Sequence, residues 1–146
     1  MKMIKTIILT CLLLIIIAAQ AALPQGKWTV EKVTIEKNTD GDVQTTVYNN
    51  ATEVKSFIPC MQELEINGQS ITLRYGKDWE DTAEYTLDGD QVTINTASGP
   101  QTYQYDDTQE GKLTLIAVYN YVNNDLQAKR SEKITEKRII TLTEQK

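Results

Sequence analysis

The chain has 146 residues, of which 40% are hydrophobic and 24% are charged, and its formal net charge is −5. This length corresponds to one domain, and an ordinary apolar fraction with many β-forming residues excludes a chain that is disordered by composition. An acidic surface repels phosphate backbones, so we expect no nucleic-acid partner.

The N-terminal segment has the three parts of a secretory signal. Lys2 and Lys5 form a short positive region, an apolar run follows, and Ala19-Gln20-Ala21 places small residues where a signal peptidase reads the chain. The apolar run is shorter than the roughly 20 residues of a spanning helix, which favours cleavage over a membrane anchor. We therefore expect a signal peptide over residues 1–21. Residues 22–146 would form one exported domain, periplasmic or secreted, without stable membrane insertion.

The two cysteines are Cys11 and Cys60. A lipoprotein signal at Cys11 is an alternative, but Thr10 is a poor residue before a lipidated cysteine, and Cys11 lies inside the apolar run. Cleavage after Ala21 removes Cys11, two lysines and no acid, so the net charge moves from −5 to −7. No intrachain disulfide can then form, and we expect the core to hold the fold. Cys60 is either a buried small hydrophobe, which we favour, or a thiol for a partner.

Short runs rich in Thr, Val, Ile and Tyr alternate with turn signals along the rest of the chain. Asn67-Gly68 and Asp88-Gly89 supply the positive φ angles of tight hairpins. Several runs alternate apolar and polar residues, which is the period of half-buried strands. In chain order, we predict strands near residues 27–36, 43–48, 61–67, 70–75, 82–88, 91–96, 101–106, 112–122 and 134–143.

Two segments do not follow this pattern. Residues 49–59 are the least strand-like and could hold a helical turn. Residues 125–133 are highly charged, and we favour a long hairpin arm over a helix there.

Sequential strands joined by tight turns predict an antiparallel meander. A meander of this length exposes two strand edges, which invite aggregation unless they are protected. Closure into an up-and-down β-barrel of about eight to nine strands removes both edges and leaves an interior for side chains or one small ligand. A two-sheet sandwich is the competing all-β solution.

Gly26-Lys27-Trp28 opens the first predicted strand. With this strand order, the chain resembles the bacterial lipocalin-like domains, which are small exported barrels. The resemblance implies that Trp28 closes the base of the barrel and that a basic residue of the last strand packs over its ring, a favourable cation–π contact. Arg138, in phase with the apolar residues of its strand, is the candidate, and Lys146 is the alternative. Trp28 could also be a plain core aromatic.

Six tyrosines lie on the predicted strands, in phase with the apolar face of their own strand or with each other. They are Tyr75, Tyr85, Tyr103, Tyr105, Tyr119 and Tyr121. If this face lines a barrel, its apolar walls and hydroxyl groups suit a small hydrophobic or amphipathic ligand. Alternatively, these side chains fill the interior or cap its rims, because small barrels are often packed solid.

The chain contains no histidine. This absence removes the usual zinc ligand and every Ser-His or Cys-His nucleophile pair. The grouped acids, such as those beside Gly41 and Gly89, are more simply turn residues than a catalytic or metal-binding pair. We expect no metal site and no cofactor.

Three functions follow, in order of preference. The first is an exported, non-catalytic binding protein with a ligand in its barrel. The second is a structural or interaction domain with a filled core, acting through its surface in the cell envelope; the sequence names no protein partner for it. The weakest is an enzyme that uses acidic residues alone.

Overall fold

Antiparallel strands make up most of the computed structural model, which describes residues 21–56, 61–76 and 78–146. Most of the expected signal peptide, the whole lipoprotein signal at Cys11, and Cys60 lie outside the described residues. The strands are β1 (Gly26–Thr39), β2 (Asp42–Tyr48), β3 (Glu63–Asn67), β4 (Ser70–Arg74), β5 (Glu80–Asp88), β6 (Gln91–Thr96), β7 (Gly99–Asp106), β8 (Lys112–Asp125) and β9 (Arg130–Glu144). A short helix, α2 (Ala51–Ser56), follows β2.

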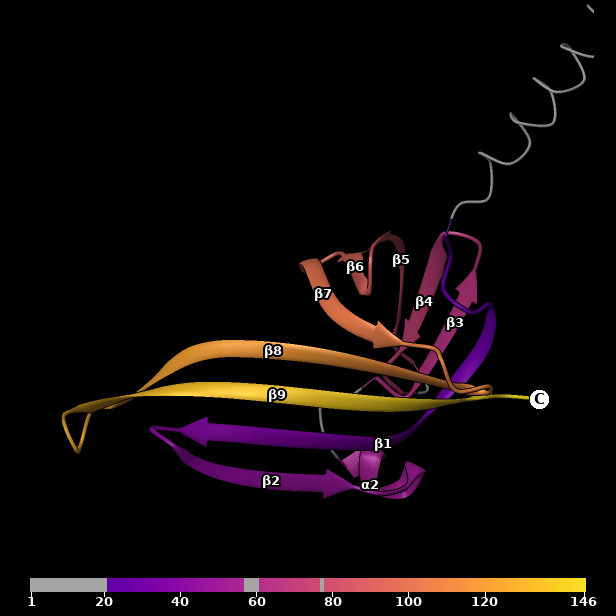
Figure 1. Cartoon of the computed structure of the whole chain (residues 1–146). Coiled ribbons are helices and arrows are strands. Elements are labelled where there is room, and N and C mark those ends of the chain that lie inside the picture. The colour runs from indigo at the N-terminus through magenta and orange to yellow at the C-terminus, as the bar shows by residue number, and fades with distance from the viewer. Residues whose placement is uncertain (1–20, 57–60, 77) are drawn as a thin grey trace, which may run out of the picture.

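Eight of these strands close into a barrel (Figure 1). Neighbours from β3 to β9 pair in sequence order, and β1 pairs with both β3 and β9. The first residues of β1 contact β3, as at Trp28 and Leu64, and β9 follows β1 along most of its length. The prediction of a closed antiparallel barrel is therefore confirmed. The alternative sandwich is wrong, because the first and last strands of the meander pair directly.

Alternate side chains of the barrel strands form one dry core. Leu64, Ile71, Val92, Leu113 and Leu142 have no measurable exposure. They are at the alternate positions that the apolar–polar pattern predicts to face the interior, since successive side chains of a strand point to opposite faces. The core therefore follows directly from the alternation of apolar and polar residues.

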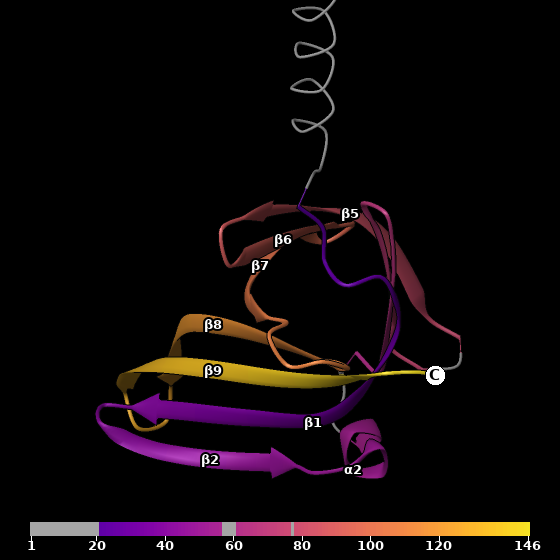
Figure 2. The ribbon, with the colours of Figure 1, turned by 45° about the vertical axis from the view of Figure 1, so that its right-hand side comes forward.

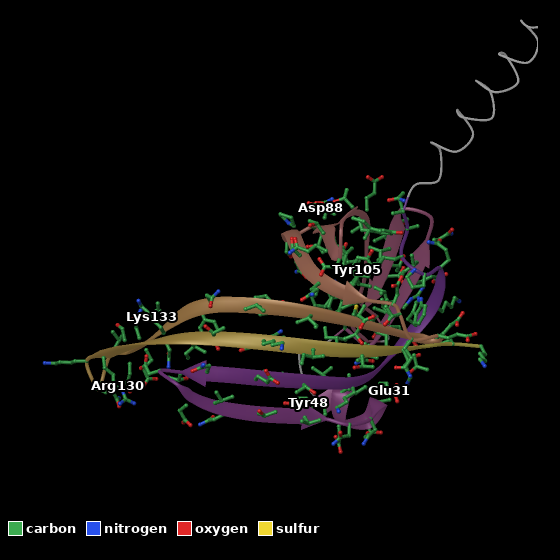
Figure 3. The ribbon with its side chains drawn as sticks, in the orientation of Figure 1. Glu31, Tyr48, Asp88, Tyr105, Arg130 and Lys133 are labelled. Atoms are coloured by element: carbon green, nitrogen blue, oxygen red, sulfur yellow. The ribbon has the colours of Figure 1, made fainter. Side chains whose placement is uncertain are left out.

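Two long hairpins continue beyond the barrel. The outer half of β1 pairs with β2 on one edge and with β9 on the other, and β8 accompanies β9 to the pair Asp125–Arg130. We call this part the projecting sheet: β2, residues 34–39 of β1, residues 117–125 of β8 and residues 130–138 of β9. It extends away from the barrel (Figures 1 and 2), with Arg130 and Lys133 near its far end (Figure 3). The predicted hairpin arm is confirmed.

Helix α2 occupies part of the segment predicted to be least strand-like. The Asn50 side-chain oxygen accepts hydrogen bonds from the backbone N–H groups of Thr52 and Glu53, both at 3.0 Å, and so caps the helix. Val54 is buried, and α2 packs against β1 (Figure 2). In the described part of the chain, no helix has the length and apolarity needed to cross a membrane.

Candidate ligand site at the open end of the barrel

One end of the barrel is closed by the segment that precedes β1. The hydroxyl group of buried Tyr85 accepts a hydrogen bond from the Leu23 N–H at 3.1 Å and donates one to the Gly68 carbonyl at 2.8 Å. The indole N–H of Trp28, also buried, donates to the Pro24 carbonyl at 3.2 Å. These bonds tie the entering chain to the β3–β4 turn, and Leu23 is buried beneath them. The entering segment and these buried side chains therefore cover this end of the barrel.

The basic partner expected for Trp28 lies elsewhere. Trp28 is opposite Glu144 in the β1–β9 register, whereas Arg138 is opposite Ile35, well along the strand toward the other end. The Arg138 guanidinium lies 5.0 Å from the centre of the Tyr119 ring. Lys146, the alternative, follows the end of β9 and is exposed. The expected Arg138–Trp28 contact is therefore wrong, because the register carries Arg138 past the base of the barrel.

A cavity of about 250 Å³ opens at the opposite end, between the β4–β5 and β6–β7 turns and the start of the projecting sheet. Its wall combines aliphatic, aromatic and polar side chains. The lining residues are Val33, Met61, Leu73, Tyr75, Trp79, Asp81, Thr96, Ser98, Gln101, Tyr103, Tyr119, Arg138 and Ile140. An apolar hollow with a few polar groups is the usual form of a small-molecule site.

Aromatic rings form much of the cavity rim. The Tyr75 and Trp79 rings lie 5.1 Å apart and are tilted by 34°, a favourable offset arrangement. Trp79 remains 63% exposed although it borders the cavity. The Tyr103 hydroxyl donates to the Gln101 side-chain oxygen at 2.8 Å. The rim therefore offers ring faces together with polar groups that are already oriented.

A buried carboxylate lies beside the cavity, where the barrel meets the projecting sheet. Glu136 is only 4% exposed. It accepts hydrogen bonds from Arg138 Nε at 2.5 Å and from the Tyr121 hydroxyl at 3.0 Å, and Lys37 Nζ lies 3.6 Å from the same carboxylate. These contacts hold Arg138 and its neighbour Tyr119 in place at the cavity wall.

The ionisation of this cluster follows from its contacts. Burial raises the pKa of Glu136, but the hydrogen bonds from Arg138 and Tyr121 and the charges of Arg138 and Lys37 outweigh it, so the net pKa lies below the ordinary value. Burial and the bond to Glu136 raise the pKa of Tyr121. At neutral pH the cluster therefore has an ionised carboxylate and a neutral phenol.

The structure distributes the six predicted tyrosines over three places. Tyr75, Tyr103 and Tyr119 line the cavity, and Tyr121 holds Glu136 next to it. Tyr85 and Tyr105 instead donate to carbonyl groups in the turns at the closed end; for Tyr105, the acceptor is Gly89 at 3.2 Å. The expected single tyrosine-lined site is thus only partly assembled, because residues in phase on different strands lie at different heights in the barrel.

Sequence reasoning missed Trp79, Gln101, Lys37 and Glu136. Glu136 and Lys37 each had a local signal, because each is a charged residue in phase with apolar residues of its strand: Glu136 precedes Arg138 by two residues and Lys37 follows Ile35 by two. Trp79 comes to the cavity from the β4–β5 turn, where the period-two pattern does not apply. Gln101 lies on β7 in phase with Tyr103, but only tyrosines were considered as lining residues of that strand.

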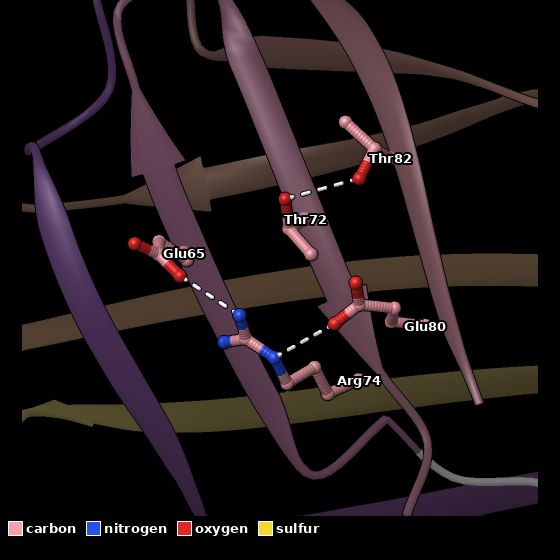
Figure 4. A network of polar contacts seen from close by, with 5 residues as sticks. All are labelled: Glu65, Thr72, Arg74, Glu80 and Thr82. Atoms are coloured by element: carbon pink, nitrogen blue, oxygen red, sulfur yellow. Dashed lines mark hydrogen bonds and ion pairs between the residues drawn. The ribbon is translucent and has the colours of Figure 1, made fainter. Parts of the chain in front are cut away.

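A second hollow, of about 350 Å³, lies beside α2 and includes Arg74 and Lys55. Arg74 is already bound across three strands: its Nη2 lies 3.0 Å from Glu65 and its Nε lies 3.2 Å from Glu80 (Figure 4). These hydrogen bonds raise the pKa of Arg74 further. Because two carboxylates occupy the guanidinium, this hollow is a weaker candidate for an anionic or polar ligand.

No protein family and no curated protein matches the sequence. One solved structure with some similarity is that of an uncharacterized protein from Bacteroides eggerthii DSM 20697. It has 15% sequence identity and a TM-score of 0.37, and the match covers 77% of this chain and 98% of that chain. The closed eight-stranded barrel fits a calycin-like architecture, and the likeness to lipocalin-like domains is one of architecture alone.

Proposed function

We propose that this protein is an exported, non-catalytic binding protein that takes a small amphipathic molecule into the open end of its barrel. The observation that carries the proposal is the cavity of about 250 Å³ with a mixed apolar and aromatic wall. Export is a separate part of the proposal and rests on the signal-like sequence of residues 1–21.

The cavity's size and lining limit the ligand. An apolar cavity of about 150 Å³ holds a benzene molecule, so the site has room for one or two rings or a short alkyl chain. Leu73 and Ile140 offer aliphatic contacts to such a body. Arg138, Asp81 and Gln101 offer charged and polar groups to its head. A purely apolar ligand would leave these polar groups without water, which disfavours it.

The ligand is sought in protein expressed from the complete sequence in its own host. Native mass spectrometry of the purified protein should show a co-purifying small molecule. If none is found, a thermal-shift screen with lipids and small aromatic acids should identify a compound that raises the melting temperature. A protein with neither a bound molecule nor a shift would contradict the proposal.

A matched pair of variants localises the binding. Ser98 lines the cavity in the β6–β7 turn, whereas its exposed neighbour Ala97 does not. Ser98→Trp should obstruct the mouth and weaken binding by about tenfold or more, since loss of about 1.4 kcal/mol of contacts has that effect. Ala97→Trp should bind as the unmodified protein does. Equal affinity in the two variants would place the ligand elsewhere.

The second candidate is an interaction domain that acts through its surface. The projecting sheet favours this reading, because a barrel that only holds a ligand does not need a sheet that extends beyond it. The same ligand experiments separate the two functions: this candidate predicts no co-purifying molecule and no stabilising compound.

A further inference from the structure

Strand β8 has a free edge in the projecting sheet. It pairs with β9 over its whole length, but with β7 only from Thr114 to Ile116. Among the described strands, none pairs with the other edge of β8 from Ala117 to Asp125, because β8 extends beyond the point where β7 leaves this edge (Figures 1 and 2). Such an edge presents unpaired N–H and C=O groups that can add another strand.

This free edge lacks the features that usually prevent strand addition. Residues 113–124 contain no charged residue and no proline, and the ladder with β9 has no bulge in this region. Val118 and Val122 are 56% and 53% exposed, and Tyr119 and Tyr121 are each 40% exposed. A hollow beside this part of β8 is lined by residues 118–121 together with Glu136 and Arg138 of β9. Edges left without charges, prolines or bulges are suited to pairing.

The sequence of the edge is a palindrome: Val118-Tyr119-Asn120-Tyr121-Val122. In an antiparallel pair of identical strands, a two-fold axis at Asn120 places Val118 opposite Val122 of the second copy. It also places Tyr119 opposite Tyr121, and Asn120 opposite itself. Directly opposed residues share a face of the sheet, so the valines meet on one face and the tyrosines on the other.

We propose that two copies of this chain pair through their β8 edges, antiparallel about a two-fold axis at Asn120, and so join their projecting sheets into one. A two-fold contact of identical strands uses the same patch on both copies and closes the assembly. The uncharged edge places no like charges opposite each other where the two acidic molecules meet. The paired aromatic and β-branched side chains add cross-strand contacts.

The tyrosines are also partly ordered before pairing. The Tyr121 hydroxyl is bonded to Glu136, and the Tyr119 ring carries the Arg138 guanidinium. Side chains that are already held lose less conformational freedom on association. Tyr119 also lines the cavity, but the pairing uses the backbone edge of β8, so the inference does not depend on a ligand.

The other free edge of the projecting sheet, on β2, is a poorer match. Its central residues Gln44, Thr45 and Thr46 are polar. A two-fold axis at Thr45 would place Asp42 opposite Tyr48 of a second copy. Val43 on this edge is 58% exposed, close to the value for Val118, and so provides a matched control position.

Two double variants test the pairing and its register. Val118→Lys with Val122→Lys places lysine opposite lysine twice and should raise the dimer Kd by about tenfold or more. Val118→Lys with Val122→Glu places lysine opposite glutamate and should form the dimer again. The control Val43→Lys should leave the dimer intact. Circular dichroism and thermal unfolding of each variant show whether its monomer is folded.

The molecular mass in solution is measured on protein that is expressed from the complete sequence and purified after any processing by the host cell. Light scattering after size exclusion and sedimentation over a range of concentrations should give twice the monomer mass. A monomer at every concentration would overturn the proposal. The edge would then be available only for strand addition by a different protein. A dimer that responds to Val43→Lys, a dimer insensitive to the lysine pair, or a failure of the lysine–glutamate variant to dimerise would also overturn it.

Discussion

At the scale of single residues, Glu136 links the barrel to the projecting sheet. It is the one charged residue that is buried in the described part of the chain, and its carboxylate holds Arg138 and Tyr121. Arg138 in turn covers Tyr119 at the cavity wall. One acid thus orients two aromatic residues from β8, on the side of the sheet that leads into the barrel.

The lowered pKa of Glu136 predicts how stability depends on pH. A carboxyl group whose pKa is depressed by folding contributes stability above its ordinary pKa, 4.5, and this contribution is lost as the pH falls through the folded-state pKa. Glu136→Gln should therefore reduce the free energy of unfolding by about 2 kcal/mol at neutral pH, since it removes hydrogen bonds to a charge. The difference between variant and unmodified protein should shrink below pH 4.5.

Urea unfolding monitored by circular dichroism, at neutral pH and at several acidic values, measures this difference. Glu31→Gln is the control: Lys112 and Thr143 lower the pKa of Glu31 by hydrogen bonding, but Glu31 lies exposed on the outer face (Figure 3). Its effect at neutral pH should be much smaller, because exposed ion pairs contribute little. A difference for Glu136→Gln that stays constant down to low pH would contradict the assignment.

At the scale of elements, the hairpin turns set the register of the barrel. Asn67 pairs with Ser70, so the β3–β4 turn consists of Gly68 and Gln69. The φ angle of Gly68 is 62°, as in a type II′ turn with glycine at its first central position. The sequence signal Asn67-Gly68 thus marks the right hairpin, although Asn67 itself belongs to the strand.

Gly68→Ala tests the demand for a positive φ. A Cβ atom at this position would meet nothing within 4 Å, so the penalty comes from the backbone alone. We expect a loss of about 1 kcal/mol in the free energy of unfolding, because a left-handed conformation costs an alanine roughly that much. Gly68→Asn should cost less, since asparagine tolerates this region better. Chemical unfolding measures the free energy of unfolding of both variants. Equal losses for alanine and asparagine would contradict the view that the positive φ angle causes the penalty.

In the molecule as a whole, β1 and β9 each belong both to the barrel and to the projecting sheet. Their paired residues Val30 and Leu142 are buried in the barrel, while Lys37 and Glu136 pair in the projecting sheet. The register shifts between Val30 and Lys32, and such a bulge bends a strand and increases its twist. The bulge lies where β1 passes from its pairing with β3 to its pairing with β2.

The division of the chain between barrel and projecting sheet predicts that the free energy of local opening differs from one part of the chain to another. The far tips of the two hairpins, residues 38–43 and 124–131, bury no apolar side chains, so they should open locally at low cost. Native-state hydrogen exchange should show the fastest exchange among strand residues at these tips. It should show the slowest exchange in β4 and β6, which lie in the barrel wall and contribute Ile71, Leu73, Val92 and Ile94 to the core. Tips as protected as β4 would contradict this picture.

Local patterns in the chain were enough to predict the strands, their inward faces and the antiparallel order of neighbours. Residues 91–96 were predicted and observed as β6, and the helical turn and the hairpin arm also lie where expected. These features depend on side-chain alternation and turn residues, which act over a few positions in the chain. For the same reason, the inward position of Tyr75, Tyr103 and Tyr119 could be predicted from their phase.

Which inward-facing residues lie at the same height in the barrel became known only from the folded arrangement of the strands. It placed Arg138 over Tyr119 rather than Trp28, separated Tyr85 and Tyr105 from the cavity, brought in Trp79, and left β2 outside the barrel. These outcomes depend on the register between β1 and β9, which are about a hundred residues apart and whose ladder shifts at a bulge. Alternation determines the face on which a side chain lies, but pairing between distant strands determines its neighbours.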